Sequence, residues 1–332
     1  MKSPALAVAI TLLPAALAGQ AIPMAPEFQA NTYTTGGQVQ PAIASSGDGR
    51  FVIAWASQLQ DGSDQGIFGQ RFDELGARTG IEFPVNDYTT GSQFKKDVAA
   101  DKDGNFVVVW SSDGQDGSGL GVFGQRFNSS GAKVGAEFQV NTFTTDDQRD
   151  PRIAADAAGN FVVVWTSVGQ DLSGAGVFGQ RFDASGAKAG SEFRVNTYTT
   201  STQYYPGVAL DGAGNFVVVW TSLGVDGSGM GVRGQRFDAS GAKAGPEFPV
   251  NTHTIADHHG NSHAYAHHHQ HAYASSHFNT GCLWPQRFSP ERRPIDRLDS
   301  QQHRPAQPPA GSSEGQCCAA HFQPPSMGLI LC

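Results

Sequence analysis

The sequence predicts an all-β fold: a β-propeller-like array of four 55-residue, four-stranded antiparallel repeats, followed by a disordered tail. Tryptophan recurs every 55 residues, at Trp55, Trp110, Trp165 and Trp220. The segment GQRF has the same spacing and begins at Gly69, Gly124, Gly179 and Gly234. The 41 glycines and the 16% of charged residues are typical of turn-rich β proteins. A constant period without insertions indicates tandem copies of one structural unit.

The first half of the unit is expected to form a hairpin, described for the third copy. The segment PRIAADAAGN predicts a short strand and a turn, because Asp156 and Gly159 supply the side-chain capping and positive φ of tight hairpins. The next five residues, FVVVW at 161–165, are apolar at every position. Such a short apolar run between turns predicts a strand buried on both faces.

The second half of the unit is expected to add two more strands. The segment GVFGQRFD alternates, with Phe178 and Phe182 on one face and Val177 and Arg181 on the other, which predicts a half-exposed strand. After a turn, SEFRVN has a polar alternate face and is expected to be the outermost strand.

Such sheets must stack on one another to cover both faces, as propeller blades do, and the tryptophans are expected to fill the gaps. An open β-solenoid is the alternative, although its repeats are commonly about 20 to 30 residues long. The EFxxN segment recurs five times, with Phe28, Phe83, Phe138, Phe193 and Phe248. The spare copy at residues 27–31 either pairs into the last sheet and closes a ring or remains a loose strand beside a four-blade ring.

The chain divides into a signal peptide at residues 1–18, an N-terminal lead at 19–26, the repeats at 27–254 and the tail at 255–332. The apolar run after Lys2 is about 15 residues long, shorter than the roughly 20 that span a bilayer, and Ala16 and Ala18 suit signal peptidase. We therefore expect a secreted or cell-surface protein with no membrane span other than the signal peptide. Acidic residues dominate the part before residue 255, which argues against a nucleic-acid partner.

The segments PxxAxDxxGNFVVVW, DGSG, GVxGQRFDxxGxxxGxEFxVN and TYTT together resemble the tandem repeats of bacterial secreted and surface proteins, whose blades are similar to those of sialidase-like propellers. The resemblance covers residues 27–254. It implies a surface or adhesive role with an unknown ligand, a glycan or a protein. It does not imply an activity, because propellers host many functions.

Sialidases use an arginine cluster, a tyrosine with an acidic partner and an aspartate, which are not repeated between blades. The chain instead repeats one arginine in every unit, which indicates a structural role, at Arg71, Arg126, Arg181 and Arg236. We expect pairing with acids such as Asp73, Asp183 or Asp238, although Asn128 interrupts that pattern. The non-repeated candidates are Arg149, Arg152, Tyr204 and Tyr205, beside which no nucleophile or acid/base group is evident.

One aspartate also recurs in the loop after each tryptophan, at Asp61, Asp116, Asp171 and Asp226. Oxygen-rich, glycine-flexed loops suit calcium, which takes six to eight oxygen ligands. One carboxylate per loop is few for calcium, and Asp-Gly is an ordinary turn dipeptide, so we favour the turn interpretation. No other cofactor is expected.

The tail has two interpretations. Histidine recurs every fourth residue, at His259, His263, His267 and His271, which on a helix would line one face and bind zinc or nickel. Alternatively the tail is translated out of frame: after the loss of one base the degenerate His, Ala and Tyr codons permit a Thr/Pro run, the composition of an extended stalk, without requiring it. We favour the second interpretation. Secreted repeat proteins with such a stalk often resemble those that end in a sorting signal of the IPTL type, and in this gene that signal would lie in another reading frame.

The sequence thus predicts an exported, non-catalytic repeat protein that acts as a surface structural or ligand-binding, adhesin-like module. The alternatives are a sialidase-like carbohydrate hydrolase or glycan-binding protein and, second, a metal binder that uses its histidine tail.

Overall fold

The computed structural model describes residues 27–225 and 229–252, which form four sheets of four strands each. The first sheet contains β1 (Gln38–Ser45), β2 (Phe51–Gln58), β3 (Gln65–Phe72) and β4 (Arg78–Pro84). The second contains β5 (Gln93–Ala100), β6 (Phe106–Asp113), β7 (Leu120–Phe127) and β8 (Phe138–Gln139). The third contains β9 (Gln148–Ala155), β10 (Phe161–Val168), β11 (Ala175–Phe182) and β12 (Phe193–Arg194). The fourth contains β13 (Gln203–Leu210), β14 (Phe216–Leu223), β15 (Met230–Phe237) and β16 (Phe248–Pro249).

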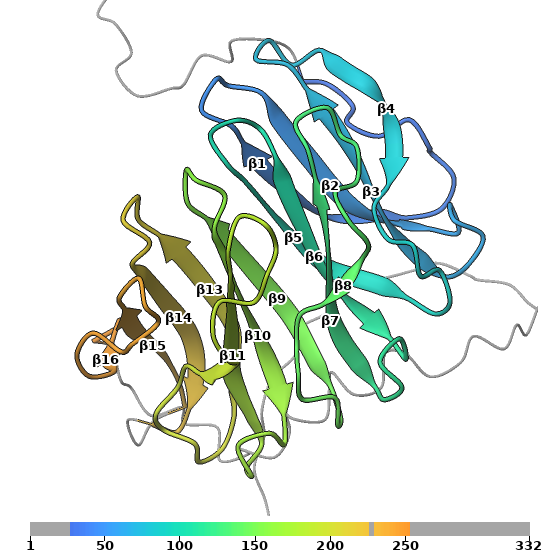
Figure 1. Cartoon of the computed structure of the whole chain (residues 1–332). Coiled ribbons are helices and arrows are strands. Elements are labelled where there is room, and N and C mark those ends of the chain that lie inside the picture. Colours follow the sequence, from blue (N-terminus) through green and yellow to red (C-terminus); the bar gives the residue numbers. More distant parts are fainter. Residues whose placement is uncertain (1–26, 226–228, 253–332) are drawn as a thin grey trace, which may run out of the picture. The chain divides into compact units, whose positions relative to one another are not determined.

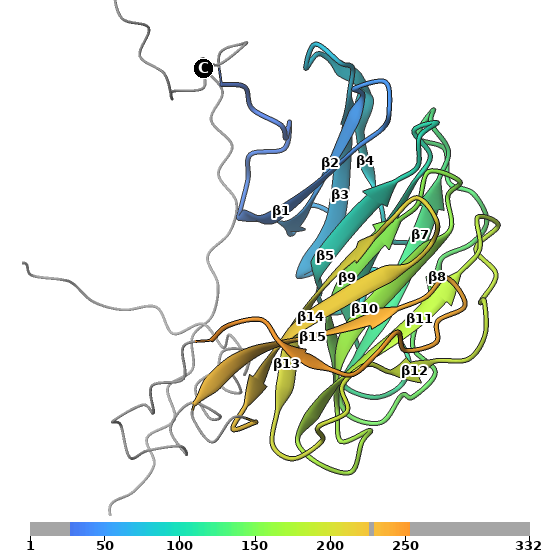
Figure 2. The same ribbon diagram turned by 90° about the vertical axis from the view of Figure 1, so that its left-hand side faces the viewer.

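Each sheet is an antiparallel meander in chain order, which confirms the predicted all-β fold of four repeated sheets. Consecutive sheets pack face to face, and their first strands are neighbours: β1 contacts β5, β5 contacts β9, and β9 contacts β13. Figures 1 and 2 show this succession of sheets, which is propeller-like in that the first strand of each sheet lies on the inner side. No helix in the described part of the chain is long and apolar enough to cross a membrane.

The FVVVW strands of the second and third sheets are buried on both faces, as predicted, whereas in the fourth sheet one face of this strand is partly exposed. In β10 the first seven residues are all buried. Trp165 has no exposed surface and packs with Phe161, Val163 and Phe178 against valines of the second sheet. The tryptophan therefore fills the gap between sheets.

The prediction that the GVFGQRFD strand is half-exposed is wrong. In β11, Phe178 faces the second sheet and Val177 faces the fourth, which confirms the alternation, but both are buried at 6% and 0% exposure. The fourth sheet covers the face of β11 that was expected to be exposed. Alternation in the sequence shows that the two faces of a strand differ, but it does not show which face is in contact with water.

The EFxVN segment forms the outermost strand, as expected, and explains the glycine of GQRF. Phe193 of β12 lies over Gly179 of β11, where a Cβ would come within 2.8 Å of the phenylalanine Cζ. The outer strand is only two residues long in three of the four described sheets, which limits the exposed edge.

The spare EFxxN copy does not pair into the last sheet, so the predicted ring closure is wrong, as is the alternative of a loose strand. Residues 27–32, which we call the N-terminal cap, lie on the first sheet. Phe28 packs on Phe72 and Phe51, with ring centroids 5.3 and 6.5 Å apart. Phe83 has the same position on the second sheet, 5.4 Å from Phe127, because each of the first four EFxxN segments precedes in the chain the sheet that it packs on.

The predicted signal peptide, the lead at 19–26, the histidine and cysteine tail and Asp226 lie outside the described residues. For these segments the predictions made from the sequence stand as predictions.

Candidate functional site

The first strands of the four sheets carry the positions at which the repeats differ most. We call residues 39–42, 94–97, 149–152 and 204–207 the inner-strand row; they lie on β1, β5, β9 and β13. The third residue of these strands is Gln, Lys, Asp or Tyr, although the first is always Gln. Since the four sheets share one fold, the fold does not require a particular side chain there. Such positions are free to serve a ligand.

Each strand of the row has a β-bulge at the same place. In β9, the pairing with β10 skips between Arg149 and Arg152, so that two residues oppose Trp165. The first bulge residue has a left-handed backbone in all four sheets: φ is 55° at Gln40, 53° at Lys95, 56° at Asp150 and 54° at Tyr205. None is glycine, and a left-handed residue costs about 1–2 kcal/mol. Bulges re-aim side chains and are over-represented beside active sites.

The bulge residues of three sheets form a chain of polar contacts. The Lys95 amide donates to Gln40 Oε1 at 2.9 Å, and Lys95 Nζ lies 3.4 Å from Asp150 Oδ1. Asp150 is 7% exposed, and its amide donates to Ser111 Oγ at 3.3 Å. Arg149 Nε lies 3.9 Å from the other carboxylate oxygen of Asp150. The contacts connect β1, β5 and β9.

Buried Lys96 and partly buried Asp97 are two ionisable neighbours in β5, next to these contacts. Lys96 is 4% exposed, and its ammonium donates to the Val39 carbonyl at 3.3 Å. Burial lowers the pKa of Lys96 to about 7, although the Asp97 charge opposes this shift. Burial raises the pKa of Asp97, although its oxygens accept from the Ile153 and Val98 amides at 3.2 and 3.0 Å. Lys96 can therefore exchange a proton near neutral pH.

The row ends at β13 with two tyrosines. Their rings lie 4.7 Å apart in an edge-to-face arrangement. Tyr204 donates to Met230 Sδ at 3.2 Å, and burial raises its pKa. Tyr205 is half exposed. Arg152 on the neighbouring strand β9 is also exposed, and exposed tyrosines and arginines are common in binding surfaces.

The recurring loop aspartates cap their own turns. Asp61 Oδ1 accepts from the Ser63 amide at 3.1 Å, and Asp171 repeats the contact with Ser173 at 3.2 Å. A Cβ at Gly66 would overlap the Asp61 carboxylate, so the carboxylate packs directly on β3. Asp116 caps the Ser118 amide in the same way at 3.3 Å. No group of three acidic, histidine or cysteine residues that could hold a metal occurs in the described ranges, and calcium binding remains a prediction.

Three of the four recurring arginines connect consecutive sheets, but the predicted pairing with acids is wrong: no such ion pair occurs in the described residues. Arg71 Nη1 donates to the Ser129 carbonyl at 2.9 Å, in a turn of the next sheet. Arg181 Nη1 donates to the Ala239 carbonyl at 2.9 Å in the same way. The aspartates are occupied by their own turns: Asp183 Oδ1 accepts from the Ser185 and Ala187 amides.

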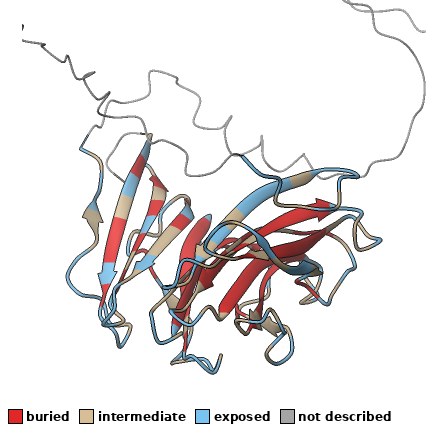
Figure 3. Cartoon of the chain, turned by 90° about the horizontal axis from the view of Figure 1, so that it is seen from above, coloured by how far each residue is buried: buried red, intermediate tan, exposed pale blue. Residues whose placement is uncertain are grey.

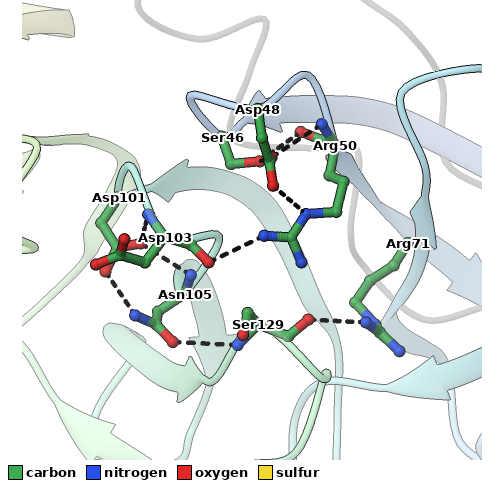
Figure 4. A network of polar contacts seen from close by, with 8 residues as sticks. All are labelled: Ser46, Asp48, Arg50, Arg71, Asp101, Asp103, Asn105 and Ser129. Carbon is green, nitrogen blue, oxygen red and sulfur yellow. Dashed lines mark hydrogen bonds and ion pairs between the residues drawn. The ribbon is translucent and has the colours of Figure 1, made fainter.

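Figure 4 shows the first of these connections between the first and second sheets. Arg50, which replaces the asparagine of the other repeats, pairs with Asp48 at 2.7 Å and donates to the Asp103 carbonyl at 3.2 Å. The Ser129 amide donates to Asn105 Oδ1 at 3.1 Å, which holds the turn that Arg71 reaches. A shallow pocket beside Arg50 and Arg71 belongs to this network and not to the inner-strand row.

The sequence identified part of the row. Arg149, Arg152, Tyr204 and Tyr205 stood out as non-repeated residues, and the structure places all four in the row. It missed the row residues on β5, namely Lys95, Lys96 and Asp97, and Asp150 on β9. An alignment of the four repeats could have identified them, because the third residue of the first strand, two positions after the shared glutamine, is different in every repeat.

Comparison with known proteins gives a distant likeness in fold. No family model matches the chain, and no curated protein matches it. An N-acetylgalactosamine deacetylase from F. plautii in complex with blood group B trisaccharide has a TM-score of 0.47 at 12% identity, over 69% of this chain and 74% of that chain. An α-L-arabinanase from Penicillium chrysogenum complexed with arabinobiose has a TM-score of 0.46 at 13% identity, over 66% and 68%. An α-L-arabinofuranosidase from Fusarium graminearum has a TM-score of 0.46 at 12% identity, over 64% and 66%.

Proposed function

We propose that the chain is an exported, non-catalytic surface protein that binds an acidic glycan through the inner-strand row. The observation that carries this proposal is the bulge that all four sheets hold in a left-handed conformation while its side chain differs in each. Strained, variable residues on a repeated scaffold are characteristic of a surface that recognises something.

The chemistry of the row suggests the ligand class. Strands β5 and β9 of the row together contribute four basic and two acidic residues, although the net charge of the chain is −8. The bases are Lys95, Lys96, Arg149 and Arg152, and the acids are Asp97 and Asp150. Arginine and lysine recognise carboxylates, and the exposed face of Tyr205 suits the apolar side of a sugar ring.

The test is titration of the full chain with oligogalacturonides and with neutral galacto-oligosaccharides of the same length. We expect binding of the acidic series only, weakened about tenfold or more by Arg152→Gln or Lys95→Gln. Lys102→Gln removes the same charge from an exposed turn and is the matched control. Equal binding of both series, or equal losses in Lys95→Gln and Lys102→Gln, would contradict the proposal.

A carbohydrate hydrolase is the second candidate, favoured by one observation. A hydrolase needs two carboxyl groups, one of which holds a proton near neutral pH. Asp97, whose pKa is raised, and Asp150, paired with Lys95, are the two carboxyl groups in the row. Release of reducing ends from the bound oligosaccharide, abolished by Asp97→Asn and by Asp150→Asn, would replace the binding proposal with this one.

A further inference from the structure

Each sheet has two unlike faces, and every interface between sheets pairs one kind with the other. The face toward the following sheet, which we call the trailing face, presents mostly small apolar residues. In the second sheet they are Ala99, Val107, Val109, Val122 and Val140, with Phe138 of the outer strand packed beside them. The face toward the preceding sheet, the leading face, presents the large residues. In the third sheet they are Ile153, Phe161, Val163, Trp165, Phe178 and Phe182.

The trailing face of the fourth sheet has the same residues but is uncovered. Val219, Val232 and Val250 are 37%, 37% and 50% exposed. Their counterparts in the second and third sheets are all 0% exposed: Val109, Val122, Val140, Val164, Val177 and Val195. Figure 3 shows the change from continuously buried interior strands to strands with exposed residues.

The fourth sheet also carries the residues that form one side of the polar contacts at the other interfaces between sheets. Arg236, the fourth recurring arginine, lies over the ring of Phe248 at 5.2 Å and does not reach a turn of another sheet within the described residues. The amides of Thr32, Thr142 and Thr197 each donate to a glutamate of the following sheet, for example Thr197 to Glu247 at 2.8 Å. Thr252 is the next residue in this series.

The first sheet presents the other half. Ile43 is 63% exposed on β1, whereas its counterparts Val98 and Ile153 are 5% and 6% exposed. The turn that would receive an arginine contains Gly76, where a Cβ would meet only a Phe28 atom, at 3.9 Å. At the corresponding glycines of the other sheets a Cβ would meet an arginine: Gly131, Gly186 and Gly241.

We propose that two copies of the chain associate head to tail, with the trailing face of the fourth sheet of one copy on the leading face of the first sheet of the second copy. The occupant is a second copy because the chain already uses these two surfaces against each other three times. This inference does not rest on the proposed glycan binding. Since the two faces differ, it is heterologous and either closes into a ring or continues as a filament.

The N-terminal cap competes with this contact. Residues 27–32 read EFQANT and residues 247–252 read EFPVNT, so both can make the same contacts. Phe28 occupies the position on Phe51 and Phe72 that Phe248 of the second copy would take. The cap has Ala30 where the competing segment has Val250, and it leaves Ile43 exposed. The cap therefore weakens association and does not abolish it.

Sedimentation velocity of the full chain over a wide concentration range tests the proposal. We expect reversible association, weakened about tenfold or more by Val232→Glu and strengthened by Phe28→Ala, which removes the competing ring. Leu172→Glu adds the same charge at a residue that is 97% exposed outside both faces, and it should leave association unchanged. Circular dichroism is the check that each variant is folded, and Val232, 37% exposed, is accessible enough to accept glutamate without loss of the sheet.

Two results would overturn the proposal. One is a chain that remains monomeric both as wild type and as Phe28→Ala. The other is a monomer in which residues 253–332 are protected from protease only while Val232 is intact, which would assign the trailing face to the chain's own tail.

Discussion

Strands β9 and β10 are hydrogen-bonded neighbours in one sheet and differ in almost every other respect. β10 begins FVVVW, as β6 and β14 do, and its first seven residues are buried. β9 contains Arg149, Asp150 and Arg152 where the other first strands have other residues, and its bulge holds a left-handed residue. The comparison teaches that one strand specifies the stack of sheets, while its neighbour is free to change. A repeat can therefore diversify its binding surface without altering its core.

The largest effect should come from the buried strand. Trp165→Ala should lower the free energy of unfolding by about 3–5 kcal/mol, because it opens a cavity between two sheets. Trp55→Ala should cost less, since no sheet of the described part of the chain packs on the leading face of the first sheet and the surroundings of Trp55 can relax. Urea titration of both variants measures the difference; equal losses would contradict the importance of stacking.

Lys96→Met, a substitution in the inner-strand row, should change how the free energy of unfolding depends on pH, an effect that is not expected of substitutions in the apolar core. The pKa of Lys96 is about 7 in the folded chain and about 10.4 in the unfolded chain, so the unfolded state binds more protons between these values. The wild type should therefore gain stability as pH rises from 7 to about 10. The variant removes this dependence and should be more stable than the wild type at pH 7 by a few kcal/mol at most. Unfolding free energies across this pH range provide the measurement, and parallel curves for the two proteins would refute it.

The arginine connections should contribute less. Arg126→Ala removes two hydrogen bonds to carbonyls of the third sheet, including one to Ala184 at 3.0 Å, and should cost about 1–2 kcal/mol. Among the described residues, Arg236→Ala loses the contact with Phe248 alone and should cost less than about 1 kcal/mol. Thermal unfolding of both variants provides the measurement, and the order of the two losses is the decisive result.

The smallest change in stability is expected at the strained bulge. Tyr205→Gly should leave the protein as stable as before or stabilise it by up to about 1 kcal/mol, because glycine accepts positive φ. It should nevertheless abolish binding of the acidic oligosaccharide. Leu172→Gly relieves a similar φ of 67° in a loop outside the row and should leave binding intact. Retained binding in Tyr205→Gly would exclude the tyrosine from the site.

The sequence was sufficient for features that depend on contacts within one repeat. The 55-residue period, the order of strands and the buried FVVVW strand follow from local patterns. Features set by neighbouring repeats were not accessible: Val177 looks solvent-facing until the fourth sheet covers it, and Arg181 looks like a partner for Asp183 until the turn of the next sheet offers a carbonyl. Part of the row could be predicted, because Arg149 and Tyr204 differ from the residues at the same position in the other repeats. The burial of Lys96 could not be predicted, because it arises only when β1, β5 and β9 assemble.

The N-terminal cap and the other EFxxN segments that pack on a sheet are translated before that sheet, which favours folding from the N-terminus during synthesis. Phe28 precedes the sheet it covers, and Phe83, Phe138 and Phe193 each precede theirs. Each sheet therefore finds its partner segment already translated when its own last strand emerges, and no sheet must wait for a distant C-terminal segment. Contacts between near neighbours in the chain favour rapid, sequential folding from the N-terminus. A chain arrested after any complete repeat would have the same apolar trailing surface as the finished protein.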